Sequence, residues 1–256
     1  MRFIKEKFWP LPFSMLWVTF LSAFTLADPE GSKEVWFTTE DKVNISGYWV
    51  APFEEGGGKK TPIILVHHFG GNRNQWDTFT PVLLEKGYAV LAIDLRGHGK
   101  STSKGKTLLD AKASDFLQNE AENMPLDVKA AIKWLKTQRD IENKKVGIIG
   151  GELGANVAFV SAGAFKEIRA AVALSPTLER LIGVEVPKFK PKSILFMSTL
   201  GDGQGAGSLS AEALAHMTED PKETKVYKGT ARGIAILHGH PEAAEDLLNW
   251  LEQRLK

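Results

Sequence analysis

Short apolar runs alternate with longer amphipathic segments along most of the chain. Residues 43–50 carry apolar side chains at every second position, and together with residues 35–38 they predict an antiparallel hairpin near the N-terminus. Later apolar runs are nearly continuous, which is typical of strands buried on both faces in the middle of a parallel sheet. These runs are Pro62–Val66, Ala89–Ile93, Val146–Ile149, Ala170–Leu174, Ser193–Met197 and, more weakly, Thr224–Tyr227.

The segments between these runs have the apolar spacing of helices that pack one face on a sheet. The predicted helices are Trp76–Glu85, Met124–Thr137, Gly154–Ala162 and Pro241–Leu255. Alternating strands and helices predict an α/β fold with a mostly parallel central sheet, helices on both faces and right-handed crossovers. Because residues 175–191 are too few for a large lid, we expect one domain over residues 28–256 with little or no cap domain.

The first 27 residues have the pattern of a secretory signal peptide. Three basic residues precede an uncharged run over residues 8–26, and Thr25-Leu26-Ala27 places small residues at the two positions that signal peptidase reads. The run is also long enough for a membrane helix, so an uncleaved anchor is the alternative. We favour cleavage after Ala27, which predicts a secreted or periplasmic protein that meets the membrane only if the N-terminal segment stays attached.

Composition excludes several classes of function. The 256 residues contain 32 Lys plus Arg and 31 Asp plus Glu, so the net charge of +1 offers no basic surplus for nucleic acid. The hydrophobic share of 43% and the charged share of 25% indicate a packed globular chain. The absence of cysteine excludes disulfides, thiolate metal sites, a cysteine nucleophile and a lipid anchor on cysteine.

Three loops with chemically active residues follow predicted strands, and open α/β sheets place their ligands at this edge. They are residues 67–76 (HHFGGNRNQW), 94–101 (DLRGHGKS) and 150–156 (GGELGAN). In this order and spacing the loops resemble those of the α/β-hydrolase superfamily, near its small lidless dienelactone-hydrolase-like and serine-peptidase-like branches. The resemblance extends over essentially all of residues 28–256 and implies the fold of that superfamily.

The resemblance assigns the third loop to the nucleophile elbow, Gly-x-Ser-x-Gly, in which a strained strand-to-helix turn presents the nucleophile. Gly150 and Gly154 match the glycines of this motif, but Glu152 stands at the nucleophile position. Asp202 matches the acid of the triad, and Arg232 stands where the histidine is expected. His238 is the alternative histidine, although it lies only two residues before the last predicted helix begins at Pro241.

We expect the two replacements to act together, because nucleophile and base positions face each other in this fold. A guanidinium can bind two carboxylates through its forked donors. Glu152 and Arg232 should therefore form an ion pair within about 4 Å, with Asp202 as the second partner of Arg232. The resemblance also implies an oxyanion hole built from backbone N–H groups, those of His68 or Phe69 and of Leu153.

Other conspicuous residues have structural roles as their first interpretation. The side chains of His67 and His68 are expected to support the first loop, although they could offer N–H groups to a ligand. Trp76 is expected to pack beneath the loop, with the pocket wall as its alternative place. Arg96 and His98 should brace the end of the sheet, and Ser175 is not placed to substitute as nucleophile. We expect no cofactor, and the sequence has no recognisable metal-ligand spacing.

Three hypotheses for function follow. The first is an exported protein with a degraded Ser-His-Asp triad, a pseudoenzyme that binds a small molecule or a protein partner. The second is an active hydrolase of esters, amides or epoxides with Glu152 as nucleophile or base, since relatives with aspartate at the elbow attack carbon directly. The third is hydrolysis through His238 and a nucleophile not yet identified. We favour the first, because a serine hydrolase needs both a hydroxyl and a base that can accept its proton.

Overall fold

The computed structural model describes residues 28–52, 58–181 and 191–256. The expected signal peptide, residues 1–27, lies outside these ranges. In the described part, no helix combines the length and the apolar character needed to cross a membrane.

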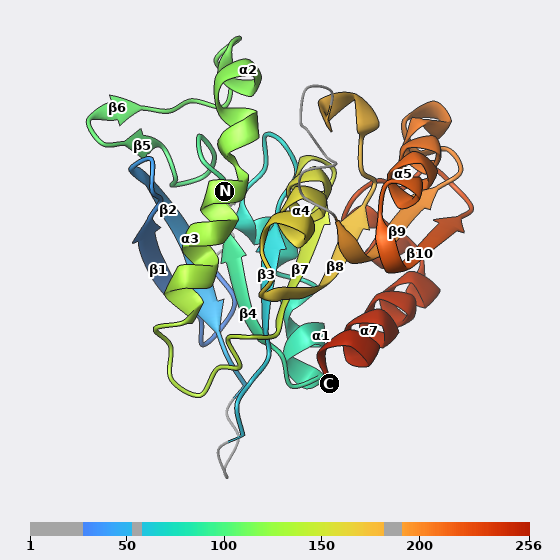
Figure 1. Ribbon diagram of the computed structural model, residues 1–256, viewed down its shortest axis with the longest axis horizontal. Helices are drawn as coiled ribbons and strands as arrows, with labels where there is room; N and C mark the ends of the chain where they lie inside the picture. The colour runs from blue at the N-terminus through green and yellow to red at the C-terminus, as the bar shows by residue number, and fades with distance from the viewer. Residues whose placement is uncertain (1–27, 53–57, 182–190) are drawn as a thin grey trace, which may run out of the picture.

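A single sheet organises the fold (Figure 1). Its strand order is β10-β9-β8-β7-β3-β4-β2-β5-β6, with β1 paired to β2. From β10 to β4 every neighbouring pair is parallel, whereas β2 is antiparallel to β1, β4 and β5. The strands are β1 (Lys33–Thr38), β2 (Val43–Val50), β3 (Pro62–Val66), β4 (Ala89–Ile93), β5 (Ser103–Lys104), β6 (Thr107–Leu108), β7 (Val146–Gly151), β8 (Ile168–Leu174), β9 (Lys192–Thr199) and β10 (Glu219–Tyr227).

Helices cover both faces of this sheet. They are α1 (Thr80–Glu85), α2 (Phe116–Glu120), α3 (Pro125–Leu135), α4 (Leu153–Ala164), α5 (Ala206–His216), α6 (Ala235–Gly239) and α7 (Pro241–Leu255). Short 3-10 turns are η1 (Arg73–Trp76), η2 (Ala121–Asn123), η3 (Leu178–Leu181) and η5 (Asp202–Gly205). One hydrophobic core lies between the sheet and α3, α4 and α5, and a second lies between the sheet and α1 and α7. The α/β architecture expected from the sequence, with a mostly parallel sheet, helices on both faces and an N-terminal antiparallel hairpin, is confirmed.

The structure corrects the first predicted helix. Residues 76–85 do not form one helix, because η1 ends at Trp76 and α1 begins only at Thr80. Pro81 stands in the first turn of α1, the place in a helix where the missing N–H of proline costs least. Helix α5 was not predicted, because its buried face consists largely of Gly207, Ser210 and Ala211, which give a weak apolar pattern.

Arg96 joins the second loop to three other parts of the fold. Its guanidinium is fully buried and pairs with Asp127 of α3 at 2.8 Å, Asp41 of the β1–β2 turn at 2.7 Å and Glu120 of α2 at 2.9 Å. The bracing role expected of Arg96 agrees with these contacts. Because Asp127 is also fully buried, its charge depends on Arg96 for compensation.

We predict that Arg96→Met lowers the free energy of unfolding by about 3–5 kcal/mol, because it leaves the Asp127 carboxylate buried and unpaired. Urea denaturation measures this loss. Lys129→Met is the matched control, since Lys129 pairs with Glu40 on the surface, and it should cost less than about 1 kcal/mol. Equal losses in the two variants would contradict the role given to Arg96.

Candidate functional site

A sharp bend between β7 and α4 presents the side chain of Glu152. The residue has a φ of 51° and a ψ of −106°, a strained conformation for any residue other than glycine. Backbone hydrogen bonds hold it there: its N–H donates to the Leu174 carbonyl at 2.8 Å, and its carbonyl accepts from the N–H of Ala155 at 3.0 Å. The bend is thus fixed by the sheet on one side and by the first turn of α4 on the other.

Close backbone packing around this bend requires two glycines. A Cβ at Gly150 would overlap the carbonyl group of Gly154. A Cβ at Gly154 would in turn overlap the Val66 carbonyl oxygen and lie 2.7 Å from that of His67. The glycine spacing seen in the sequence is therefore a steric requirement of the elbow, independent of the residue at its tip.

We predict that Gly150→Ala destabilises the protein by about 3 kcal/mol or more, because backbone atoms cannot move aside for the added methyl group. Thermal or urea unfolding measures the effect. Gly58→Ala is the control, because a Cβ at Gly58 meets nothing within 4 Å, and it should change stability by less than about 0.5 kcal/mol. An unaltered Gly150→Ala protein would contradict this account of the bend.

Arg232 lies between the two carboxylates of the site, as expected from the sequence. Its Nε is 2.5 Å from Oδ1 of Asp202, and one terminal nitrogen is 3.6 Å from Oε2 of Glu152. The Asp202 side chain is fully buried, whereas the side chains of Glu152 and Arg232 are 33% and 44% exposed. The pair of Arg232 with Asp202 is close and buried on one side, and the pair with Glu152 is looser and open to solvent.

The loop that carries Arg232 is fastened to neighbouring strand ends. The Gly233 N–H donates to Oγ of Ser175 at 2.8 Å, and Oγ1 of Thr199 donates to the Ala231 carbonyl at 2.9 Å. Ser175 is buried, with 1% of its surface exposed, and this contact gives it a structural role. The side chain of Glu152 lies over Gly233, where a Cβ would come within 3.3 Å of its Cγ.

Burial raises the pKa of Asp202 above its ordinary value. The Ser175 side chain and the charge of Arg232 lower it, and the charge of Glu152 raises it further. Burial makes the charged form of Asp202 unfavourable, and the nearby charge of Glu152 adds to this cost. The positive charge of Arg232 offsets both effects.

One of the two alternative oxyanion donors in the first loop is occupied. The backbone N–H of His68 donates to Oε1 of Gln75 at 3.2 Å, which occupies the donor that the sequence had offered to a ligand. The sequence missed this contact because nothing in the pattern predicts that Gln75 folds back over the loop. Leu153 begins α4 directly after the bend, and the ring of Phe69 packs edge-on against His98 at 5.3 Å. The oxyanion roles of the Phe69 and Leu153 N–H groups stay predictions.

The side chain of His67 has a structural role in the interior of the protein. It is fully buried, its Nδ1 donates to the His68 carbonyl at 2.6 Å, and its Nε2 accepts from the N–H of Leu95 at 3.0 Å. Burial lowers the pKa of His67 to about 3, so the ring is neutral in the folded protein. The His68 side chain bonds within the same loop, with Nδ1 2.7 Å from the Phe69 carbonyl oxygen.

We predict that stability falls as the pH drops from about 6.5, the unfolded pKa of histidine, toward 3. In this window the unfolded chain binds a proton at His67 and the folded protein does not, so the free energy of unfolding decreases by up to about 1.4 kcal/mol per pH unit. Urea denaturation at pH 7, 6 and 5 measures the slope. His67→Asn should be less stable at pH 7 but show a flatter slope, and an unchanged slope would contradict the assignment.

His238 and Trp76 lie outside the group around Glu152. His238 is exposed on α6, and its Nε2 is 2.8 Å from Oγ1 of Thr78. The structure therefore gives no support to His238 as the alternative base, because Arg232 is the side chain that reaches Asp202 and Glu152. Trp76 is fully buried in the core beneath the first loop, which excludes it from the pocket wall.

A cavity of about 350 Å³ lies away from this group, lined in part by Glu40, Lys129, Lys133, Phe165 and Glu167. None of the residues around the bend lines it. In the described ranges, no set of three or more His, Asp or Glu side chains is arranged to hold a metal ion.

The order of the strands and the elbow geometry can be compared with known proteins. The family model for the alpha/beta hydrolase fold matches residues 61–214, which include the elbow and the acid position. The chain belongs to the α/β-hydrolase family. Among solved structures of this family, the esterase Pf2001 of Pyrococcus furiosus superimposes with a TM-score of 0.66 at 25% identity, covering 88% of this chain and 93% of that one.

Other relatives and solved structures match most of the chain. The "Uncharacterized peptidase YuxL" of Bacillus subtilis (strain 168) is 30% identical over 60% of this α/β-hydrolase chain, which spans 22% of that protein. A 31.7 kDa protein of the traX-finO intergenic region of Escherichia coli is 31% identical over 71% of the chain and 56% of its own length. An acetyl xylan esterase from Paenibacillus sp. R4 shares the fold, with a TM-score of 0.65 at 18% identity, covering 87% of this chain and 83% of that one.

Proposed function

We propose that this α/β-hydrolase is an exported pseudoenzyme that binds a small molecule at the carboxyl edge of its sheet. The observation that carries the proposal is the ion pair at the elbow, where Glu152 faces Arg232 in place of a nucleophile and its base. A serine hydrolase needs a hydroxyl and a group that accepts its proton. Arginine stays protonated in proteins, so it cannot act as that base.

The competing hypothesis is catalysis by the Glu152 carboxylate. A carboxylate can attack carbon, but the ester it forms must then be hydrolysed, and water activation again requires a base. Glutamate is also longer than aspartate by one methylene, roughly 1.5 Å, which shifts the attacking oxygen relative to the oxyanion donors. The position of Glu152 over Gly233 and beside Arg232 favours a paired carboxylate over an attacking one.

The open part of the ion pair suggests what the site binds. The Arg232 side chain is 44% exposed, and its 3.6 Å separation from Glu152 exceeds a hydrogen bond. A guanidinium in this state can bind a ligand carboxylate or carbonyl with its remaining donors. Relatives named as esterases and a peptidase make acyl compounds the first class to test. A protein partner that inserts an acidic side chain is the second candidate.

Export is the other part of the proposal. Basic residues before an uncharged run, followed by Thr25-Leu26-Ala27, favour cleavage after Ala27 and a secreted or periplasmic protein. The charge of the remaining chain, 1 − 2 = −1 after loss of Arg2, Lys5, Glu6 and Lys7, gives no reason to expect nucleic acid as a partner.

The experiment is an assay of purified protein with p-nitrophenyl acetate and with an epoxide. We expect no turnover by the wild-type protein beyond that of Glu152→Ala. The double variant Glu152→Ser with Arg232→His should gain esterase activity, at least about 100-fold above buffer, because a general base contributes at least that factor.

The matched control is Glu152→Ala with Arg232→His, which has the base but no hydroxyl and should stay inactive. Wild-type turnover that disappears in Glu152→Ala would overturn the pseudoenzyme proposal in favour of a carboxylate nucleophile. A folded but inactive Ser-His variant would show that the pocket is not arranged for acyl transfer.

A further inference from the structure

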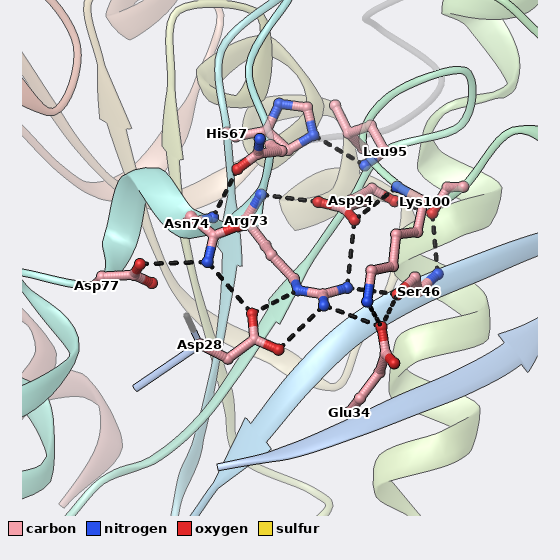
Figure 2. Close-up of polar contacts among 12 residues, drawn as sticks. Asp28, Glu34, Ser46, His67, Arg73, Asn74, Asp77, Asp94, Leu95 and Lys100 are labelled. Atoms are coloured by element: carbon pink, nitrogen blue, oxygen red, sulfur yellow. Dashed lines mark hydrogen bonds and ion pairs between the residues drawn. The ribbon is translucent and has the colours of Figure 1, made fainter. Parts of the chain in front are cut away.

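A second group of charges surrounds Arg73 of the first loop (Figure 2). It includes Asp28, the first residue that the structure describes. We call it the Arg73 cluster; its charged members are Asp28, Glu34, Arg73, Asp77, Asp94 and Lys100. Neither the elbow nor the α/β-hydrolase resemblance accounts for it. The cluster brings the N-terminal segment against the loop that carries His67 and His68.

Arg73 is the buried centre of this cluster. Its side chain is only 4% exposed, with Nε 3.0 Å from Oδ1 of Asp28 and one terminal nitrogen 3.0 Å from Oδ2 of the same residue. The guanidinium also pairs with Glu34 at 3.0 Å and with Asp94 at 3.3 Å. The bidentate pair with Asp28 is the kind of arginine contact with the best geometry.

Asp77 stands on the other side of Asp28, where the charge of Arg73 lowers its pKa but no ion pair joins it to a cation among the described residues. The side-chain amide of Asn74 donates to Oδ1 of Asp28 and to Oδ2 of Asp77, each at 3.2 Å, so the two carboxylates flank one amide (Figure 2). Oδ1 of Asp77 is buried without a close hydrogen-bond partner among the described residues, and the Tyr48 hydroxyl lies near enough to the carboxylate to lower its pKa. A buried carboxylate oxygen without a partner is costly, which points to a missing donor.

The cluster as described has too little positive charge. Four carboxylates face two cations, and the Lys100 side chain is 57% exposed and pairs with Glu34. Burial raises the pKa of Asp77 and of Asp94, and the charge of Asp28 raises each further. The negative surplus therefore lies around Asp28 and Asp77, and a further cation there would stabilise the fold.

Cleavage after Ala27 would create a cation at this position. Hydrolysis adds water across the Ala27–Asp28 peptide bond, leaving a carboxylate on Ala27 and an amine on Asp28 that takes up a proton near neutral pH. Because Asp28 N is joined to its own carboxylate through three carbons, the ammonium must lie within about 5 Å of Oδ1. No set of three metal-ligating side chains converges in the described ranges, which favours an amine over a metal ion.

We propose that processing between Ala27 and Asp28 places the new α-ammonium group in the Arg73 cluster, where Asp77 binds it. The inference rests on the proposed cleavage after Ala27 and extends it, because it gives processing a structural consequence. Arg73, Asn74 and Asp77 belong to the segment that follows His67 and His68. The free terminus thus completes the support of the first loop, and the loop of an unprocessed chain lacks that support.

The test compares two proteins that differ by one residue at the N-terminus. One begins at Asp28 and the other at Ala27, each released from a fusion by a protease that leaves no extra residue. All described elements lie within residues 28–256, so both contain the whole domain. We expect a melting temperature about 3 °C higher for the protein that begins at Asp28, because its ammonium meets Asp77 directly.

The Asp77→Asn variant of each protein identifies the partner. The difference between the two N-termini should fall below about 1 °C in this background, because the amide no longer attracts the ammonium. Glu30→Gln is the control: Glu30 is an exposed acid close to the terminus and outside the cluster, and its loss should leave the difference unchanged. A difference that Asp77→Asn does not alter, or no difference at all, would overturn the proposal.

A second measurement uses only wild-type sequence at position 77. The α-amine is acetylated with a limiting reagent at pH 7.5 and followed by mass spectrometry of the N-terminal peptide. We expect reaction at least 10-fold slower for the folded Asp28 protein than for the folded Ala27 protein, and equal rates would contradict binding. N-terminal sequencing of the exported full-length chain tests cleavage itself, so failure of the export proposal is distinguished from failure of amine binding.

Discussion

The bend between β7 and α4 is the constraint on which the functional edge of the molecule depends. Gly150 and Gly154 leave no space for a Cβ, and hydrogen bonds from the sheet and α4 hold Glu152 at a φ of 51°. None of these steric contacts and backbone hydrogen bonds involves the Glu152 side chain. The bend therefore does not depend on the side chain at its tip, and the hydrolase fold is compatible with a glutamate at this position.

The residue at the tip nevertheless restricts what can stand opposite. Asp202 is fully buried, and the charge of Glu152 raises its pKa further. A neutral histidine at position 232 would leave two carboxylates facing each other in a partly desolvated space. Arg232 resolves this conflict because one guanidinium reaches both, at 2.5 Å and 3.6 Å. The electrostatics of the site thus link the residues at positions 152 and 232.

The sequence was most informative where a local rule decides the structure. Continuous apolar runs predicted the parallel strands, and α7 has the predicted bounds Pro241–Leu255. The elbow was predicted from the resemblance to α/β-hydrolases, whose motif glycines Gly150 and Gly154 match. Local rules fail where distant segments decide. The bond from His68 to Gln75 and the pairing of Asp28 with Arg73 depend on how the loop folds back and on where the N-terminal segment lies. Helix α5 could not be predicted, because the small residues on its buried face give almost no apolar periodicity.

Three arginines at the carboxyl edge, Arg73, Arg96 and Arg232, bind carboxylates, but they differ in exposure. Arg73 and Arg96 are 4% and 0% exposed, and both join segments that are distant in sequence. Arg232 is 44% exposed, and its distance to Glu152 is the longest of these contacts. Exposed ion pairs of this kind contribute at most about 1 kcal/mol to the free energy of unfolding. Their contribution to stability therefore does not explain why a glutamate stands in a strained conformation at the elbow. For this reason we propose that a ligand binds both the exposed guanidinium and the carboxylate at this site.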